Sequence, residues 1–404
     1  MGLASKRRTS AVSSKIPQLR SKTLEIHGGG SVNDTDIRPQ LDRVIAFSLG
    51  SFERAKRLFE GTEEGFIYSR INNPTVDHLE KRLVALEGAE AGLATSSGMS
   101  AIALLTLHLA HSGGHIITSN RLYGGVFHLF RDRMPALGIP VTFIENPHDI
   151  KQWEKAIRPE TKFLYVESPS NPLIDIFDIA QLADIAHKNN LPLVVDSTLA
   201  TPVLLRPISL GADVVVHSLS KYMGDGEVVG GMILGKKKFI DDVRVGWLRD
   251  TGPCISPDNA AILCYHIESL HARMHEHCRN ASDVAKFLSK HSKVKQVHYP
   301  SFGKRARKNK ELMPEGFGGL MAFDIHGGKR EAKIVLENLK LFWHAANIGE
   351  ARSLVIHPGT TTHGQMASRE LEAAGISQST IRLSIGREDS RDLINDLKQA
   401  LAKI

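Results

Sequence analysis

The chain has 404 residues, of which 42% are hydrophobic and 24% charged, so it can bury the cores of two domains and is not expected to be disordered as a whole. No apolar run approaches the roughly 18 residues of a membrane-spanning helix, and the N-terminus lacks the apolar core of a secretory signal, so we expect a cytoplasmic protein without membrane contact. The formal net charge is +7, but six basic residues precede the first acidic one, Glu25, and the remainder carries only +1, which argues against a nucleic-acid partner for the folded body.

The first 60 residues are expected to lie outside the main domains. Residues 1–23 are rich in Ser, Lys and Arg, a composition typical of a disordered tail, although an organelle-targeting or polyanion-binding role stays open. Residues 24–60 have mixed character and are expected to form an arm that packs against another part of the protein.

The next stretch predicts an α/β domain. Apolar spacing predicts a helix over residues 75–87 and a second, buried helix over residues 100–111. Short apolar or β-branched runs then alternate with helical patterns, and we expect strands at residues 115–118, 141–145, 163–167, 193–196 and 214–217. This alternation predicts a mostly parallel sheet covered on both faces, in which ligands bind beyond the carboxyl ends of the strands. That rule directs attention to Glu167, to Asp196 and to the pair His217 and Ser218.

The C-terminal part predicts a smaller α+β domain. Residues 258–289 read as one long helix that connects the two domains. Strands are expected at residues 294–299, 320–325 and 381–385, with helices at residues 331–338 and 390–404 between and after them. The predicted division is therefore a tail (1–23), an arm (24–60), a large domain (61–257) and a C-terminal domain (258–404).

Three sequence patterns are compatible with a metal or nucleotide site, but a structural interpretation is preferred for each. The three cysteines, Cys254, Cys264 and Cys278, form no paired metal motif and are interpreted as structural residues of a reducing compartment. His271 and His275 stand one helical turn apart but lack a third ligand, so no metal is expected. Residues 316–319 contain three glycines, but they precede a strand and are interpreted as a turn.

Two segments could together serve an electron-sink cofactor. In residues 193–198, an apolar run is followed by Asp196. In residues 213–221, a second apolar run is followed by Ser218, Ser220 and Lys221. Such a cofactor needs a lysine amine, an anion near its ring nitrogen and donors for its phosphate. The spacing alone also allows Asp196 to cap a turn and Lys221 to be a surface lysine, so both interpretations stay open on this ground.

Several ordered motifs resemble one family over residues 25–404. They are Tyr-Ser-Arg-Ile-Asn-Asn-Pro-Thr at 68–75, Ser-Gly-Met at 97–99, Leu-Tyr-Gly-Gly at 122–125, Glu-Ser-Pro-Ser-Asn-Pro at 167–172, Asp-Ser-Thr at 196–198, Ser-Leu-Ser-Lys-Tyr at 218–222, His-Pro at 357–358, Thr-Thr-His at 361–363 and Arg-Leu-Ser at 382–384. The set resembles the pyridoxal 5'-phosphate (PLP) enzymes of cysteine and methionine metabolism. The resemblance implies the aspartate aminotransferase-like fold, called fold type I, and PLP as the cofactor.

The resemblance also implies roles for residues near the cofactor ring. Lys221 would bind PLP covalently and then act as the acid and base that moves substrate protons. Asp196 would pair with the ring nitrogen, and Asn171 would contact the ring oxygen. Tyr123 would stack on the ring and take a proton from the incoming amine.

Further residues would hold the phosphate and the substrate. The backbone N–H groups of Gly98 and Met99 and the hydroxyls of Ser218 and Ser220 would bind the phosphate. By resemblance, Tyr68 and Arg70 would reach the phosphate of a neighbouring subunit, which implies a homo-oligomer, at least a dimer and usually a tetramer. Arg382 would hold the α-carboxylate of an amino-acid substrate, with Asn347 beside it.

Departures from the family pattern bear on the reaction. Ser197 follows the cofactor aspartate where asparagine is usual, and Gly125 stands where methionine-cleaving members typically carry cysteine. Residues 346–354, with Asn347, and residues 357–363 are closest to the O-acylhomoserine sulfhydrylase branch. We therefore expect γ-replacement on an O-acylhomoserine with sulfide to give homocysteine. Cystathionine γ-synthase, a cystathionine or methionine γ-lyase and a catalytically weak PLP-binding protein are the alternatives.

Overall fold

The large sheet lies within the first two thirds of the chain. The computed structural model describes residues 19–29 and 40–404. Over these residues a seven-stranded sheet has the order β1 (Ala91–Thr95), β7 (Gly231–Gly235), β6 (Val214–Ser218), β5 (Leu193–Asp196), β4 (Thr161–Glu167), β2 (His115–Ser119) and β3 (Val141–Ile144). Strands β6, β5, β4, β2 and β3 pair in parallel, whereas β7 is antiparallel to both β1 and β6. The mostly parallel sheet agrees with the sequence prediction, but β1 and β7 were not predicted.

Alternate side chains of the central strands enter two separate apolar cores. Val194 and Val216 pack in the core that contains α4 (Gly98–Leu109) and α5 (Gly124–His128). Val195 and Val215 pack on the opposite face, whose core contains the helices α3 (Pro74–Glu87), α8 (Ile179–Lys188) and α12 (Pro257–Ile267). Helices therefore cover both faces of the sheet, as a doubly wound sheet requires.

Short helices complete the large domain. They follow strands or extend longer helices, and none exceeds seven residues: α6 (Met134–Ala136), α7 (Ile150–Ala156), α9 (Thr201–Leu204), α10 (Lys237–Val243), α11 (Arg249–Thr251), the 3-10 helix η3 (Pro207–Leu210) and the π-helices η2 (Leu129–Arg133) and η4 (Arg244–Leu248). Of the helices in the described ranges, none is long and apolar enough to cross a membrane.

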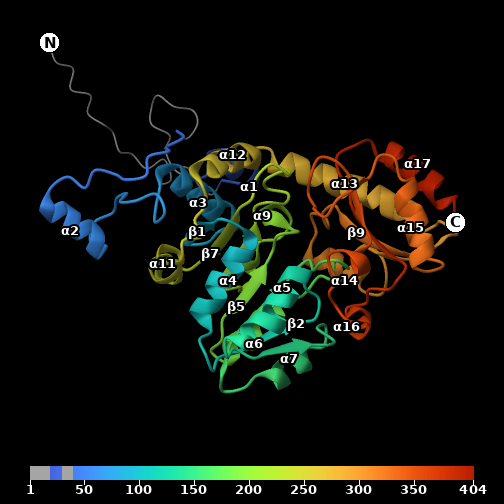
Figure 1. The fold of residues 1–404 in the computed structure, drawn as a ribbon, viewed down its shortest axis with the longest axis horizontal. Coiled ribbons are helices and arrows are strands. Elements are labelled where there is room, and N and C mark those ends of the chain that lie inside the picture. Colours follow the sequence, from blue (N-terminus) through green and yellow to red (C-terminus); the bar gives the residue numbers. More distant parts are fainter. Residues whose placement is uncertain (1–18, 30–39) are drawn as a thin grey trace, which may run out of the picture.

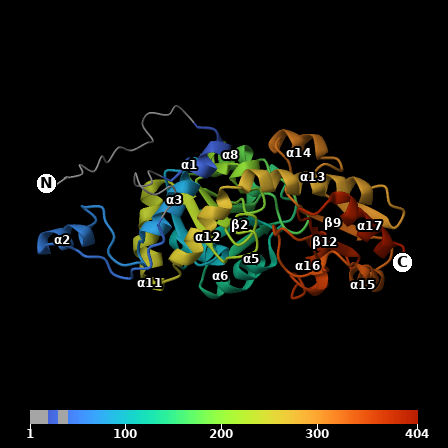
Figure 2. The same cartoon turned by 90° about the horizontal axis from the view of Figure 1, so that it is seen from above.

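The C-terminal region carries its own sheet. Five strands of the described chain are ordered β10 (Trp343–His344), β11 (Leu354–Ile356), β12 (Thr380–Ser384), β9 (Leu320–Ile325) and β8 (Val294–His298). The remaining helices of this region are α13 (Leu270–Leu288), α14 (Ala306–Leu312), α15 (Lys329–Asn338), η5 (Pro358–Thr360), α16 (Ser368–Ala373) and α17 (Ser390–Leu401). Figures 1 and 2 show this sheet and its helices gathered at one end of the molecule, with α13 running from the large domain into them.

The single long helix predicted over residues 258–289 is wrong, because α12 and α13 are separate helices. The break lies at Glu268 and Ser269, where Ser269 has φ −115° and ψ 8°. The carbonyl oxygen of His266 accepts hydrogen bonds from Ser269 Oγ at 3.2 Å and from Arg273 Nη2 at 2.8 Å. In a continuous helix this oxygen would accept from the backbone N–H four residues later. Because side-chain donors occupy it instead, the chain turns there.

Part of the predicted disordered tail is helical. Helix α1 (Ser21–His27) begins inside the predicted 1–23 tail, of which residues 1–18 lie outside the described part of the chain. The helix is held because the buried carboxylate of Glu25 accepts from His271 N at 2.9 Å and lies 2.8 Å from His271 Nδ1. His271 therefore has a structural partner next to the segment predicted to be disordered.

One helix of the predicted arm stands apart from the body. Figures 1 and 2 both show α2 (Phe52–Glu60) projecting away from the two sheets. Its Phe52 and Phe59 side chains are 83% and 70% exposed. Large apolar side chains so exposed on a projecting helix are typical of a surface that another chain covers.

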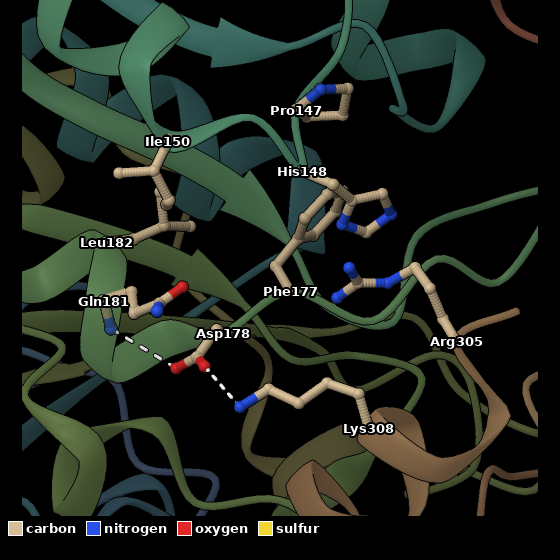
Figure 3. Close-up of a pocket in the computed structure, with 9 residues that line it drawn as sticks. All are labelled: Pro147, His148, Ile150, Phe177, Asp178, Gln181, Leu182, Arg305 and Lys308. Atoms are coloured by element: carbon tan, nitrogen blue, oxygen red, sulfur yellow. Dashed lines mark hydrogen bonds and ion pairs between the residues drawn. The ribbon is translucent and has the colours of Figure 1, made fainter.

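Helix α14 contacts the large domain beside a small cavity. Figure 3 shows Lys308 reaching Asp178, with Lys308 Nζ 3.0 Å from Asp178 Oδ2. The other carboxylate oxygen, Oδ1, accepts from the Gln181 backbone N–H at 3.3 Å. Asp178 thus caps α8 and binds α14 with the same carboxylate. The contact fastens the C-terminal region to the large domain.

Candidate active site

Polar side chains at three strand ends face the same side of the large sheet. Glu167, Asp196 and Ser218 are the last residues of β4, β5 and β6. Each stands two residues after a side chain of the α4 core, namely Tyr165, Val194 and Val216. Because side chains alternate along a strand, all three polar groups point toward the start of α4, as expected from the sequence.

Asp196 is half-buried by residue exposure and fixed by neighbouring donors. Its Oδ1 accepts from Thr198 N at 2.9 Å, and Tyr165 OH donates to its Oδ2 at 3.4 Å. Burial raises the pKa of Asp196, and the hydrogen bonds from Thr198 oppose that shift. The Thr198 hydroxyl oxygen also accepts from Ser218 N at 2.8 Å, which ties the ends of β5 and β6 together.

Lys221 extends into the same cleft from the turn after β6. Its Nζ donates to Asn347 Oδ1 at 2.7 Å. Burial and the nearby positive charge of Arg382 lower the pKa of Lys221 to about 8, although Glu350 opposes the shift. A lysine whose pKa is lowered in this way is suited to act as a nucleophile toward a carbonyl group.

The N-terminus of α4 approaches the end of β6 closely. A Cβ atom on Gly98 would lie only 2.7 Å from Ser218 Cβ, so glycine is required for this approach. The Ser97 side chain caps the helix by accepting from Ser100 N. The first-turn N–H groups of Gly98 and Met99 have no intrahelical acceptors, which suits an anion at this point.

Tyr123 is positioned by Glu167. The backbone N–H of Tyr123 lies 2.9 Å from both carboxylate oxygens of Glu167, and the phenol ring is exposed to the cleft. Burial and the nearby Asp196 raise the pKa of Glu167 well above its usual value. Glu167 therefore supports the turn that carries Tyr123.

Arg382 is a buried cation that forms no ion pair with an acid of residues 19–29 or 40–404. The residue is 3% exposed, and burial lowers its pKa to about 10. Its Nη1 donates to Asn171 Oδ1 at 3.2 Å and its Nη2 to Asn347 O at 3.3 Å, while within the described chain its buried Nε finds no acceptor. A buried guanidinium with an unused donor indicates that an anionic ligand binds there.

These groups line one cleft, which holds about 870 Å³ of empty space including its open mouth. Its lining comes from both domains and consists of Ser97, Gly98, Met99, Ile102, Tyr123, Val126, Glu167, Pro169, Asn171, Asp196, Thr198, Leu199, Ser218, Ser220, Lys221, Ala346, Asn347, Ile348, Thr362 and Arg382. A lysine amine, a half-buried carboxylate and an anion-binding helix start within one cleft fit PLP, and the first-turn N–H groups of α4 suit its phosphate.

Two predicted site residues lie outside this cleft. Tyr68 and Arg70 are exposed, and the Arg70 guanidinium stands 5.4 Å from the centre of the Tyr68 ring. Arg70 also contacts the carbonyl oxygen of Arg249 in α11. The remaining predicted residues are brought together, and Ser220 among them exchanges hydrogen bonds with the backbone of Gly230.

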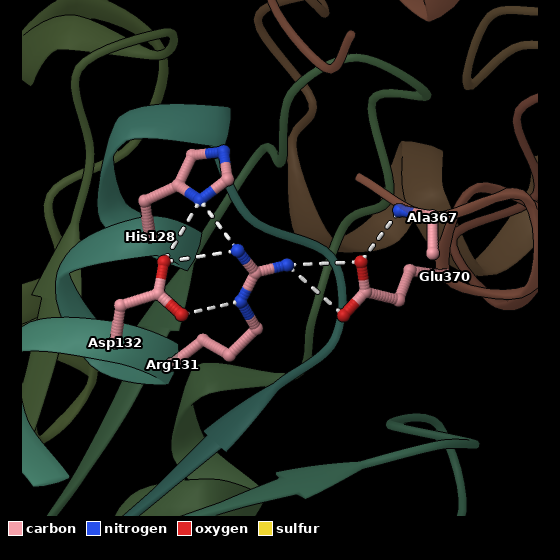
Figure 4. A network of polar contacts seen from close by, with 5 residues as sticks. All are labelled: His128, Arg131, Asp132, Ala367 and Glu370. Carbon is pink, nitrogen blue, oxygen red and sulfur yellow. Dashed lines mark hydrogen bonds and ion pairs between the residues drawn. The ribbon is translucent and has the colours of Figure 1, made fainter. Parts of the chain in front are cut away.

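A segment that follows β11 forms part of one wall of the cleft. Thr362 contributes to the lining, and the neighbouring His363 Nε2 lies 3.5 Å from Leu122 O. Figure 4 shows how α16 is fastened: Arg131 Nη1 donates to both carboxylate oxygens of Glu370 at 2.9 and 3.0 Å. Asp132 in turn binds the Arg131 guanidinium through two hydrogen bonds of 2.7 and 2.9 Å.

Sequence reasoning gave no role to several residues that shape this cleft. Thr198, Tyr165 and Glu350 act through hydrogen bonds or charge on Asp196, Ser218 or Lys221. Only Thr198 carried a signal, because Asp196 and Thr198 are spaced as in an Asx turn. No cluster of three or more potential metal ligands occurs in residues 19–29 and 40–404.

Comparison with known proteins gives consistent matches. The sequence model of the Cys/Met metabolism PLP-dependent enzyme family matches residues 22–402. An O-acetyl-L-homoserine sulfhydrylase from Corynebacterium glutamicum is 40% identical, with 97% of this chain and 99% of the relative covered. An L-methionine gamma-lyase from Fusobacterium nucleatum subsp. polymorphum is 38% identical, with 95% and 98% covered.

A solved structure agrees with the fold and the cofactor. A Campylobacter jejuni protein assigned as an O-acetylhomoserine (thiol)-lyase is 36% identical, with a TM-score of 0.92 over 95% of this chain and 100% of that one. Its crystal structure contains N'-pyridoxyl-lysine-5'-monophosphate. The expected fold type I and PLP dependence are thus confirmed, and the chain belongs to the Cys/Met metabolism PLP-dependent enzyme family.

Proposed function

We propose that this enzyme replaces the acyl group of an O-acylhomoserine with sulfide and releases homocysteine. The observation that carries the proposal is the buried Arg382, which lines the cleft together with Lys221 and Asn347 and whose Nε has no hydrogen-bond acceptor among the described residues. An amino-acid carboxylate supplies the missing anion. The Asn347-containing loop and the identity to O-acetylhomoserine sulfhydrylases favour an activated homoserine as that amino acid.

In this proposal the chain's own groups orient the substrate and move its protons. When bound, PLP supplies an electron sink for the negative charge left after a substrate C–H bond breaks. Arg382 binds the α-carboxylate, a deprotonated Tyr123 phenol oxygen takes a proton from the incoming ammonium group, and Lys221 Nζ carries protons to and from the substrate carbons. The C–O bond at the γ-carbon breaks, the acyl group leaves as a carboxylate, and sulfide forms the new C–S bond.

The cofactor roles follow the same geometry. Asp196 would pair with the ring nitrogen, Asn171 would contact the ring oxygen, and the phosphate would lie against the α4 N-terminus. Ser218 and Ser220 would complete that phosphate site. Each role is supported by the position of the residue in the lining of the cleft.

We also propose an oligomeric state and a cellular compartment for the enzyme. Tyr68 and Arg70 lie outside the cleft of their own chain, and α2 exposes two phenylalanines, which supports a cytoplasmic homo-oligomer in which Arg70 completes a neighbouring site. We propose a dimer with shared sites, paired into a tetramer. The division into a large domain (61–257) and a C-terminal domain (258–404) belongs to the same proposal.

Spectra and product assays test the function together. Purified wild-type and Lys221→Ala proteins would be compared for a visible cofactor band, which only the wild type should retain after gel filtration. O-acetylhomoserine, O-succinylhomoserine, cystathionine and methionine would then be supplied with and without sulfide. Homocysteine from an acylhomoserine and sulfide supports the proposal. Release of a 2-keto acid from methionine without sulfide would instead assign a γ-lyase, the activity of other relatives.

A further inference from the structure

The loop at residues 346–350 is held rigidly beside Lys221. A Cβ atom on Gly349, which has φ +79°, would lie 2.5 Å from the backbone nitrogen of Tyr222. Gly349 N also donates to Ser384 Oγ at 3.1 Å. The backbone of the loop is therefore fixed against the residue that follows Lys221, and only its side chains are left to adjust.

One of these side chains, Asn347, joins Lys221 to Glu350. Asn347 Oδ1 accepts from Lys221 Nζ at 2.7 Å, and Asn347 Nδ2 donates to Glu350 Oε1 at 2.6 Å. The two ends of an amide are not equivalent, because the oxygen accepts hydrogen bonds and the nitrogen donates them. Turning the amide by half a turn would set two donors against each other at Lys221 and two acceptors at Glu350.

Glu350 is itself held in place by a glycine. A Cβ atom on Gly226, which has φ +85°, would lie 2.7 Å from Glu350 Cγ and 3.3 Å from Glu350 Oε1. The half-buried Glu350 side chain thus lies against the backbone of the turn that follows Lys221. This packing keeps the carboxylate within reach of Asn347.

We infer that Glu350 is a positioning residue, which fixes the amide of Asn347 so that its oxygen holds the Lys221 amine for proton transfer. The inference rests on the proposed role of Lys221 as acid and base. Glu350 is not among the residues that line the cleft, and its carboxylate contacts Asn347. An amide at position 347 therefore needs an acid at position 350, whereas a hydroxyl, which can rotate to accept from one side or the other, does not.

The first experiment replaces the carboxylate with its neutral isostere. In Glu350→Gln, the rate at which cofactor-free protein captures PLP covalently is followed by visible absorbance as a function of pH. Glutamine keeps one acceptor oxygen but lacks the negative charge and can turn its amide to present a donor to Asn347, so the midpoint of this profile should move to lower pH than in the wild type. Turnover should fall about tenfold while KM changes by less than about threefold, because the misplaced amine affects proton transfer more than binding.

A matched variant and a double-mutant cycle separate positioning from other effects. Glu337→Gln removes an exposed acid of α15 and should match the wild type in both assays and in thermal unfolding. In an Asn347→Ser background, the additional change Glu350→Gln should cost less than about twofold in turnover, with a smaller midpoint shift, because no amide is left to orient.

Two results would overturn the inference. One is a Glu350→Gln enzyme with wild-type capture and turnover, and the other is an equal effect of Glu350→Gln in the wild-type and Asn347→Ser backgrounds. The capture profile requires no acyl donor or sulfide. A protein that captures PLP with the expected profile but makes no homocysteine would therefore refute the proposed function and leave the positioning role standing.

Discussion

Two opposed effects act on the pKa of a single residue, Lys221. Burial and the charge of Arg382 lower its pKa to about 8, while Glu350 acts in the other direction. With a pKa near 8, about one in ten Lys221 amines is neutral at pH 7, against fewer than about one in a thousand for an ordinary lysine. The cleft therefore prepares the amine for covalent reaction before any cofactor binds.

The pH dependence of cofactor capture follows from this shift. Only the neutral amine attacks a carbonyl carbon, so the capture rate in the wild type should rise with pH and level off above about pH 8. Arg382→Leu removes the positive charge and should move the midpoint upward, since the lysine then keeps its proton to higher pH. If stopped-flow absorbance gave a wild-type midpoint at about pH 10, the pKa of the Lys221 amine would be that of an ordinary lysine.

Gly98 permits a prediction on cofactor affinity. In Gly98→Ala the added methyl would lie 2.7 Å from Ser218 Cβ, so α4 must move away from β6. Overpacking of this kind costs about 1–3 kcal/mol, which corresponds to an affinity for PLP weakened about tenfold. Equilibrium dialysis against PLP measures the loss. Gly113→Ala, with open space around its Cβ but a positive φ, controls for general strain and should leave the PLP affinity unchanged.

Individual residues were predictable where they follow one another in a strand or turn. Asp196 ends an apolar run and Lys221 follows another by a few residues, so the sequence predicts that both lie near the same edge of the sheet, whereas their roles came only from the family resemblance. Glu350 was not predictable, because its function depends on a loop of the other domain lying against Tyr222. Resemblance supplied Asn347, but no sequence spacing relates Glu350 to Lys221.

Among the elements, α16 fastens the segment after β11, which carries Thr362, to the part of the chain that holds the large sheet. Glu370 accepts two hydrogen bonds from Arg131 and a third, at 2.8 Å, from Ala367 N at the start of its own helix. Asn120 Nδ2 donates to Ala373 O at 3.1 Å at the other end of the helix. The segment that carries Thr362 is thus fastened at both ends of α16.

Glu370→Gln should loosen this segment selectively. The neutral side chain can still accept from Ala367 N, whereas the ion pair with Arg131, worth about 1 kcal/mol at a partly exposed site, is lost. We expect a several-fold higher KM for the amino-acid substrate and faster cleavage of residues 358–376 by a protease, with cofactor affinity unchanged. Glu372→Gln on the same helix is the control. Equal KM values for the two variants would show that the ion pair does not secure the cleft.

Elements were predictable where a local pattern was strong. Strands β2, β4, β5, β6 and β9 follow from runs of β-branched and apolar residues. Strands β1 (Ala-Gly-Leu-Ala-Thr) and β7 (Gly-Met-Ile-Leu-Gly) contain little of this pattern, and they are strands because they pair with each other and with β6. The break between α12 and α13 likewise depends on Arg273 reaching back to a carbonyl group.

At the scale of the whole molecule, the two sheets share one apolar core. The cluster that contains Val195 of the large sheet continues through Met274 of α13 to Phe323 of the small sheet. Lys308 and Asp178 add an ion pair between the two parts of the chain. A continuous core of this kind holds the two walls of the cleft in a fixed relation.

Subunit mixing tests whether the sites are shared. Arg70→Ala and Lys221→Ala should each be inactive alone, because each removes a group from every proposed site. Co-expressed in equal amounts, they should form mixed dimers in which one of the two sites is intact, giving about a quarter of wild-type activity. A mixture that stays inactive, with mixed dimers confirmed by mass spectrometry, would place Arg70 outside the neighbouring site.

The alternation of side chains between two cores also restricts how this site can change. Asp196 faces the cleft because it stands an even number of residues from Val194, whereas its neighbour Val195 faces the other core. Insertion of one residue within β5 would turn the carboxylate into an apolar interior and bring a valine to the cofactor. Insertions and deletions in these strands are thus tolerated only when they add or remove two residues, because an even number keeps each side chain on its own face of the sheet. The site can therefore diversify by substitution and by changes in loop length, but not by a one-residue shift of a strand.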